Sequence, residues 1–378
     1  MISSISRKFS YDWVLIFSVL FILSFSFLVI YSFSFNRAGA SSEIFFKQVV
    51  FFLVGIPIFI FFSLVDYRNW KGYGKALFLL GIGLLIAVLF WGKNIRGATG
   101  WFDLGFFNFQ PAEIMKVFFI IVLARYFSRF SSEEDLGWKQ VFGSLFYLFL
   151  PALFLYFQPD MGSVAVLVFI WFLMIFLSGI KLSKLVAIIL IFLLGLVFSW
   201  TFVLKDYHRA RIESFLNPNL DPKGSGYNVI QSMVAVGSGG ISGKGYGYGS
   251  QSQLNFLPEQ HTDFIFAMIA EEGGLIGSLL LILTFWLMLF RINRIMNQAV
   301  DQFGFLFCGG VLAMMFFQIV VNIGMNLGVM PVAGLALPFL SYGGSHLLVS
   351  FACLGIVQNI WIKRRKEEYE LEQTEEEF

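Results

Sequence analysis

Runs of about 20 apolar residues recur along almost the whole 378-residue chain, and this recurrence constrains the fold more than any other feature. A helix of that length and composition spans the hydrocarbon core of a bilayer. The chain is 58% hydrophobic, contains 49 Phe and is only 13% charged, which excludes an ordinary soluble domain. We therefore predict an integral membrane protein.

The apolar runs predict an all-α polytopic membrane protein with ten transmembrane helices. The expected spans are 13–35, 45–65, 76–91, 111–128, 141–157, 161–178, 184–204, 263–290, 303–325 and 345–362. The first run follows Arg7 and Lys8, as in a signal peptide. It is too long for a signal-peptide core and lacks a clear cleavage site, so we interpret it as a span.

Residues 1–366 are expected to form one membrane domain, interrupted by a long segment, 205–262, between the seventh and eighth spans. Residues 367–378 form an acidic tail, interpreted as a solvated helix end or a disordered tail. The apolar and aromatic content of the long segment indicates that it is ordered and lies on the membrane face.

The distribution of Lys and Arg predicts the topology. The connections on the side of the N-terminus hold Arg7, Lys8, Arg68, Lys71, Lys75, Arg125, Arg129, Lys139, Lys181, Lys184, Arg291, Arg294, Lys363, Arg364, Arg365 and Lys366. The short connections on the other side hold only Arg37, Lys47, Lys93 and Arg96. Because basic residues concentrate in cytoplasmic loops, we expect both termini in the cytoplasm and segment 205–262 outside.

Several binding classes receive no support from the composition. A net charge of only +2 gives no support for a nucleic-acid-binding protein. Cys308 and Cys353 lie inside apolar runs, where a thiol is a packing residue, and three His with two Cys give no zinc spacing.

Ionisable residues crowd the start of the eighth span. They are Glu259, His261, Asp263, Glu271 and Glu272. An ionisable group at the edge of hydrocarbon is costly unless it has a partner or a function. Asp263 is thus a candidate site residue, but locally it could equally be a helix N-cap, with Thr262 as a competing cap.

The long segment 205–262 contains two distinct patterns. In its first part, Val229, Met233 and Val236 stand at helical spacing, which predicts an interfacial helix. The glycine-rich run, residues 237–250, has seven Gly in fourteen positions and predicts a tight turn or a close backbone approach. It does not match a Walker A loop; it could be a structural hinge, or an anion site that uses Lys244.

Other polar residues fall on the same outer side. Glu113 and Lys116 share a helix face just after Pro111, either as a self-satisfied ion pair or as part of a site. Asp160 precedes the sixth span, as a cap or as a functional residue. Pro- and Gly-broken backbone leads from the ninth span to Ser341 and His346, and such backbone at membrane depth requires protein or a polar cavity around it. This convergence favours a site at Asp263 over a cap.

The sequence resembles the shape, elongation, division and sporulation (SEDS) family over nearly the whole chain, and four stretches carry the resemblance most strongly. They are GWFDLGFFNFQPAEIMK, FQPDMGS, GYNVIQSMVAVGSGGISGKGYGYGSQSQLNFLPEQHTDFIFAMIAEE and NIGMNLGVMPVAGLALPFLSYGGS. QSQLNFLPEQHTDFIFA favours the elongation branch over the division branch. Two positions depart from the family: His346 stands where Ser is commoner, and Ala336 where Pro is commoner.

The resemblance implies a peptidoglycan glycosyltransferase of the bacterial cytoplasmic (inner) membrane. Such an enzyme polymerises lipid II at the outer face, with a class B penicillin-binding protein, other membrane proteins of the elongation complex and membrane lipids around it. The reaction needs a general base and positive charge for a departing pyrophosphate.

We expect Asp263 to be the base. Arg209, Arg211, Lys244 and Lys116 are candidates to hold the pyrophosphate, and a divalent cation, Mg²⁺ or Mn²⁺, could share that task; no organic cofactor is expected. The Arg pair could instead neutralise lipid headgroups. Glu113 is expected to position Lys116, with Asp160, Glu259, His261 and Ser341 as further substrate-site candidates.

Two other functions fit parts of the sequence. Many spans, broken helices and intramembrane charge also suit a flippase that moves lipid II across the bilayer. The charged groups gather at one face and no internal repeat is evident, which counts against a carrier. A scaffold for the penicillin-binding protein would leave the acidic cluster unexplained.

Overall fold

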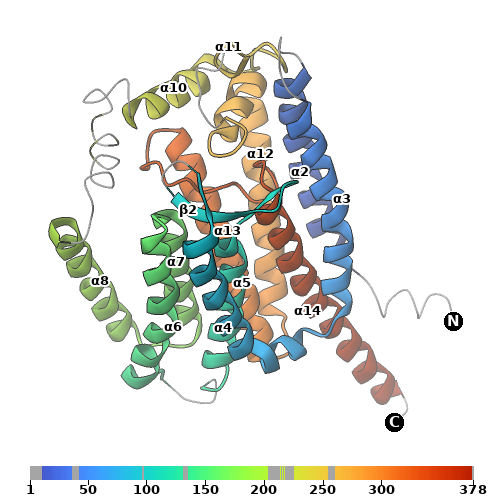
Figure 1. Cartoon of the computed structure of the whole chain (residues 1–378). Helices are drawn as coiled ribbons and strands as arrows, with labels where there is room; N and C mark the ends of the chain where they lie inside the picture. Colours follow the sequence, from blue (N-terminus) through green and yellow to red (C-terminus); the bar gives the residue numbers. More distant parts are fainter. Residues whose placement is uncertain are drawn as a thin grey trace.

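The computed structural model describes residues 11–35, 42–95, 98–130, 135–202, 213, 215, 217, 225–253 and 260–376. Each of the ten predicted spans coincides with a long helix (Figure 1). These helices are α2 (Trp13–Phe35), α3 (Glu43–Leu64), α4 (Tyr67–Trp91), α5 (Pro111–Phe127), α6 (Trp138–Phe157), α7 (Met161–Leu177), α8 (Leu182–Phe202), α12 (Ile265–Asn297), α13 (Gln302–Asn326) and α14 (Gly344–Glu376).

Seven of the described helices are long and apolar enough to cross a membrane, namely α2, α3, α4, α6, α12, α13 and α14. Met161–Leu177 and Leu182–Gly195 are shorter apolar helices, and α5 has 17 residues. The fold is therefore that of a multi-pass helical membrane protein, as predicted.

Helices α4 and α14 extend well beyond their apolar runs. α4 starts at Tyr67 rather than near residue 76, because the Asp66 carboxylate caps it by accepting from the Arg68 amide. α14 continues through Glu376, so much of the expected acidic tail is helical. Ion pairs at 2.6 Å, Lys363 with Asp66 and Glu367 with Arg68, hold this extension against the start of α4. Hydropathy does not detect such polar helical turns at a membrane surface.

The core lies around α5, α13 and α14. In the most apolar stretch of each helix, 67% of α13 and 89% of α14 are buried, against 17% of α3. α14 packs along α3, α5 lies against α4 and α13, and α12 lies between α2 and α13. The helices of this centre carry the polar residues of the candidate site into the protein interior.

A small antiparallel sheet, which the sequence did not predict, precedes α5. Its strands β1 (Lys93–Ile95), β2 (Ala98–Asp103) and β3 (Asn108–Phe109) follow in chain order. A Lys93 Nζ to Asp103 Oδ2 ion pair of 2.8 Å links β1 with β2, and this contact lowers the pKa of Asp103. The sheet leads directly into Pro111, so it sets where α5 begins.

The glycine-rich run docks on a break in α12. α10 (Ser225–Ser238) lies across α12 and α13, and α11 (Ser250–Gln253) follows the run (Figure 1). Gly274 in α12 has φ +63° and ψ −162°, which interrupts the helix. Backbone amides and carbonyls of the run and of residues 271–276 then bond each other, for example Leu275 N to Gly240 O at 2.9 Å and Lys244 N to Glu271 O at 3.0 Å. Broken backbone at this depth is satisfied by protein, as the membrane requires.

α8 stands apart from the other helices (Figure 1). Most of its large apolar side chains are exposed, whereas Leu185 and Ile188 are buried. Its first turn is attached by Asp135, whose carboxylate accepts from Lys184 Nζ at 2.6 Å. Hydrogen bonds from Lys184 and Lys181 hold the pKa of Asp135 below its usual range.

Candidate functional site

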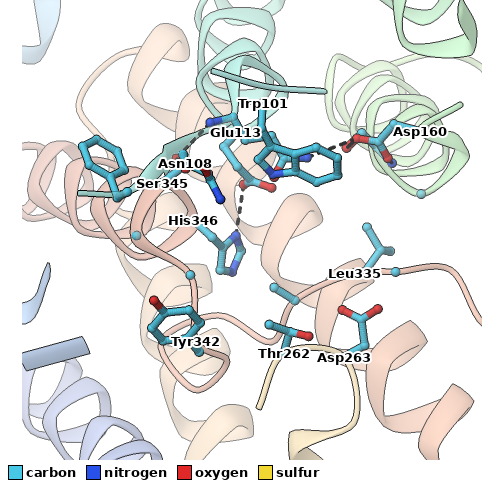
Figure 2. A pocket seen from close by; sticks show the side chains of 18 of the residues that line it. Trp101, Asn108, Glu113, Asp160, Thr262, Asp263, Leu335, Tyr342, Ser345 and His346 are labelled. Atoms are coloured by element: carbon cyan, nitrogen blue, oxygen red, sulfur yellow. Dashed lines mark hydrogen bonds and ion pairs between the residues drawn. The ribbon is translucent and has the colours of Figure 1, made fainter. Parts of the chain in front are cut away.

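A cavity of about 450 Å³ opens where the ends of several helices meet. Its wall comes from α3, the loop between β2 and β3, the starts of α5, α7 and α14, residues Thr262 and Asp263, and residues 333–336. Figure 2 shows Glu113, Asp160, Asp263 and His346 around this space. We call it the polar cavity.

The chain before α12 is fixed through three successive backbone carbonyls. Tyr342 N donates to His261 O at 2.9 Å, and Ser341 Oγ donates to Thr262 O at 2.7 Å. The Asp263 carbonyl accepts from the side-chain amides of Asn322 at 3.0 Å and Asn326 at 3.1 Å. The backbone that carries the Asp263 carboxylate is therefore held from two other elements.

Asp263 is not the helix cap. α12 begins at Ile265, and the N-cap position falls on Phe264, which makes no side-chain cap bond. The partly buried Asp263 side chain lines the polar cavity instead. The site interpretation of Asp263 thus agrees with its placement.

Asn322 and Asn326 support the Asp263 backbone without lining the polar cavity, and they were not predicted from the sequence. Both are fully buried in α13, and Asn326 also accepts from the Ala267 amide through Oδ1 at 3.0 Å. Asn322 additionally donates to Leu335 O at 2.6 Å, which holds the broken segment after α13. Two Asn one helical turn apart inside an apolar span were the available signal.

The start of α5 carries a buried ion pair. Lys116 Nζ donates to Glu113 Oε1 at 2.7 Å, and the side chains are 1% and 9% exposed. This is the predicted pair, and Glu113 has a further partner: its Oε2 lies 3.0 Å from His346 Nδ1 of α14. Glu113 and His346 line the polar cavity, whereas Lys116 lies behind Glu113. Glu113 therefore connects two groups that can be cationic.

Asp160 caps a helix and also lines the polar cavity, so its position is compatible with both predicted roles. It caps α7, accepting from Ser163 N at 2.9 Å and from Ser163 Oγ at 2.7 Å. It also lines the polar cavity and accepts from Gln110 Nε2 at 3.4 Å.

The remaining described candidates do not line the polar cavity. Lys244 Nζ bonds to Glu271 Oε1 of α12 at 2.8 Å, outside the polar cavity, so it anchors the glycine-rich run. Ser341 supports Thr262, and the His261 ring stacks on Phe33 with centroids 5.7 Å apart. Arg209, Arg211 and Glu259 lie outside the described residues.

Comparison with known proteins places the chain in a family. The profile described as "Cell cycle protein", which covers FtsW, RodA and SpoVE, matches residues 12–366. The chain belongs to the SEDS family. Because this match covers nearly the whole chain, every helix of the polar cavity is part of the SEDS fold.

SEDS relatives resemble the chain over most of their length. "Peptidoglycan glycosyltransferase MrdB" of Escherichia coli is 37% identical over 330 residues, covering 87% of this chain and 89% of that protein. "Probable peptidoglycan glycosyltransferase FtsW" of Haemophilus influenzae is 38% identical over 299 residues, covering 78% and 75%. "Stage V sporulation protein E" of Bacillus subtilis is 37% identical over 319 residues, covering 83% and 86%.

Solved SEDS structures share the fold. A chain in "Structural coordination of polymerization and crosslinking by a peptidoglycan synthase complex" superposes with a TM-score of 0.80 at 32% identity, covering 94% of this chain and 98% of that chain. The "Rod shape determining protein RodA" of Thermus thermophilus gives 0.70 at 28% identity, with the same coverage.

Proposed function

We propose that this SEDS protein is a peptidoglycan glycosyltransferase of the elongation type that polymerises lipid II. The observation that carries the proposal is the Asp263 carboxylate, facing a polar cavity on a backbone held at three successive carbonyls. Relatives named as peptidoglycan glycosyltransferases match the chain over more than three quarters of its length. A fixed carboxylate in a polar cavity suits a general base.

In the proposed reaction, the 4-hydroxyl of an acceptor sugar attacks the anomeric carbon of a lipid-linked donor chain. Asp263 takes the hydroxyl proton, a new glycosidic bond forms, and the bond to the polyprenyl pyrophosphate breaks with inversion. The leaving pyrophosphate carries away the electron pair of that bond, so positive groups must stabilise it. Holding Asp263 through its own backbone reduces the freedom that would otherwise be lost at the transition state.

Exchange of Asp263 for Asn tests this role, because the amide keeps the shape but cannot take a proton. We expect Asp263→Asn to lower polymer formation from lipid II by roughly 10²-fold or more, with the thermal unfolding temperature unchanged. Asp103→Asn is the matched control, since Asp103 lies in the exposed sheet and pairs with Lys93. Gel electrophoresis of glycan made by the purified, reconstituted protein provides the measurement; normal polymerisation by Asp263→Asn would remove the proposed base.

The same reconstitution separates the polymerase from the flippase. In sealed vesicles, a polymerase converts lipid II to glycan, whereas a flippase leaves it unpolymerised on the opposite leaflet. The polar cavity lies at one end of the bundle helices, between the starts of α5, α7 and α14, which favours chemistry at one face over passage through the midplane.

We further propose a class B penicillin-binding protein as the partner, with other elongation-complex membrane proteins and membrane lipids nearby. The similar chain described within a peptidoglycan synthase complex that couples polymerization and crosslinking supports this proposal. The proposed location is the bacterial cytoplasmic membrane, with both termini in the cytoplasm, on the basis of the Lys and Arg distribution.

A divalent cation would be held jointly with the substrate. Among the residues that the structure describes, no group of three His, Cys, Asp or Glu is arranged to hold a metal ion. Asp160 and Asp263 line the same cavity and supply carboxylate oxygens, the ligands that Mg²⁺ and Mn²⁺ prefer. The pyrophosphate would provide the remaining ligands, and the cation would neutralise its charge as it leaves.

A further inference from the structure

His346 is fixed in one orientation at the edge of the polar cavity. Its side chain is 7% exposed, and Nδ1 lies 3.0 Å from Glu113 Oε2. The other Glu113 oxygen accepts from Lys116 Nζ at 2.7 Å, and a carboxylate in such an ion pair offers only acceptor atoms. His346 Nδ1 therefore carries a proton, and in the neutral ring Nε2 has the free lone pair.

His346 lines the polar cavity, and its second ring nitrogen is left without a hydrogen bond from the described residues. Nε2 is buried and has no hydrogen-bond partner within the described part of the chain. In Figure 2 the ring lies between the Glu113 carboxylate and Tyr342, with one nitrogen turned toward Glu113 and the other away from it. Leaving a buried polar atom without a partner is costly, so a ligand that bonds this nitrogen would regain that free energy.

The charges around His346 indicate which ligand suits it. Within the described part of the chain, the ionisable groups that face it or share the cavity are Glu113 and Lys116 of α5, Lys47 of α3, Asp160 before α7, Asp263 before α12, and Tyr342 before α14. Lys116 is already bonded to Glu113, and Lys47 to Glu43 at 2.6 Å. Asp160 and Asp263 bring negative charge to the cavity, so a further positive group in the wall would favour the entry of a pyrophosphate.

We propose that His346 binds a phosphate oxygen of the polyprenyl pyrophosphate through Nε2–H and takes up one proton as the pyrophosphate enters. The inference rests on the proposed function, because that function supplies a pyrophosphate-linked substrate. Glu113 holds the imidazolium in place through Nδ1–H, and Lys116 balances the second oxygen of Glu113. When the product leaves, the ring releases the proton to solvent and returns to its neutral form.

Binding of farnesyl pyrophosphate to the purified full-length chain tests this role without turnover. Calorimetry in two buffers of different ionisation enthalpy should show uptake of about one proton per ligand bound by the wild type. His346→Gln should lose most of that uptake and bind roughly tenfold more weakly. Farnesol, which has the same tail without phosphate, is the matched ligand and should bind both proteins equally.

The pH dependence provides a sign test. Since the protonated ring is the binding form, the affinity of the wild type for farnesyl pyrophosphate should fall as pH rises, beyond any change seen in His346→Gln. Subtraction of the variant removes the titration of the ligand itself and of Asp160, Asp263 and Lys47. Equal affinity and equal pH dependence in the two proteins would overturn the proposal.

Imidazole ¹⁵N spectra report the ring directly. The chain has three His, and the signals missing from His346→Gln belong to His346. Farnesyl pyrophosphate should convert these signals from the Nδ1–H tautomer to the imidazolium; a ring that stays neutral with the ligand bound would mean that Nε2 donates no proton to the phosphate, and the proposal would be wrong. His346→Ser replaces the Gln variant should the latter fail to fold, as judged by gel filtration and thermal unfolding.

Polymerisation assays keep the two proposals distinguishable. Failure of the wild type to polymerise lipid II, with intact proton-linked pyrophosphate binding, would contradict only the proposed function. Polymerisation by His346→Gln with an unchanged KM for lipid II would contradict only the role of His346. An increased KM with a smaller change in kcat is the expected result.

Discussion

At the scale of single residues, the side chains that support Asp263 are as informative as Asp263 itself. Asn322 and Asn326 donate to its carbonyl, and Ser341 to that of Thr262. The bonds reach across 59 and 63 residues of sequence for the two Asn. They should fix the carboxylate more than they stabilise the fold.

We predict that Asn326→Leu lowers the kcat of lipid II polymerisation by roughly 10- to 100-fold, because small displacements of a catalytic group are costly. The variant removes the amide bonds to Asp263, Asn322 and Ala267. Gln318→Leu is the matched control, a buried amide two helical turns earlier in α13 with no hydrogen bond to residues 261–263 among those described. Equal kcat in both variants would show that the Asn bonds do not position the base.

The Glu113 and Lys116 pair yields a second prediction at this scale. Lys116→Met leaves a buried carboxylate with only His346 beside it and should lower the free energy of unfolding by about 3–5 kcal/mol. The double variant Glu113→Gln, Lys116→Met removes both charges and should recover most of that loss. Thermal unfolding in detergent measures both; a double variant as unstable as the single one would show that lost packing, not charge, is responsible.

Residue spacing predicted only what is local. Glu113 and Lys116 stand three apart, so their pairing follows from the helix period. His346 meets Glu113 across 233 positions, and no spacing encodes that contact. The charge of Lys244 predicted a position near the pyrophosphate, but its partner is Glu271. The sequence showed Glu271 only as one of the ionisable residues near the start of the eighth span and did not indicate this pairing.

At the scale of elements, the break in α12 and the glycine-rich run form one unit. A Cβ at Gly274 would lie 2.2 Å from the Gly243 amide nitrogen, and a Cβ at Gly243 would lie 2.2 Å from Glu272 O. The run's glycines predicted a close approach, and this prediction is confirmed. Its partner could not be predicted, because Gly273 and Gly274 look like ordinary small residues in an apolar helix.

We predict that Gly274→Ala lowers the free energy of unfolding by about 2 kcal/mol or more. Gly274 has a positive φ, and the added Cβ would clash with the backbone of the glycine-rich run. Gly277→Ala, one turn further along α12, meets nothing within 4 Å and should be neutral or stabilising by up to about 1 kcal/mol. Thermal unfolding of the two variants side by side provides the measurement. A Gly274→Ala protein as stable as Gly277→Ala would show that the run can leave α12 without cost.

At the scale of the whole molecule, hydropathy predicted the ten long helices that the structure describes and their order, but not their arrangement. Apolar runs identify spans because the bilayer demands them. Which helix lies beside which depends on buried polar contacts between distant segments, such as those joining α2, α12 and α14. There, the Asp12 carboxylate accepts from Arg291, and the Asp12 amide donates to Gln358 Oε1 at 3.0 Å.

We predict that Arg291→Met destabilises the assembled bundle by about 3–5 kcal/mol, because it leaves the buried Asp12 carboxylate without its cation. Arg294→Met is the control: Arg294 is exposed on the same helix, and its loss should change the free energy of unfolding by less than about 0.5 kcal/mol. Denaturant unfolding followed by tryptophan fluorescence compares them. Equal stability would mean that packing alone joins the three helices.

α10 and the glycine-rich run leave the ribosome before α12 and α13, the two helices on which they pack. Ser232 donates to the Asn326 carbonyl at 2.8 Å, so its acceptor is synthesised 94 residues later. Segment 225–253 therefore waits during synthesis, first for α12 and then for α13. A chain stopped between residue 253 and α12 would leave Ala235 without Phe264 and Ala267, against which it packs, which makes this interval the vulnerable stage of biogenesis.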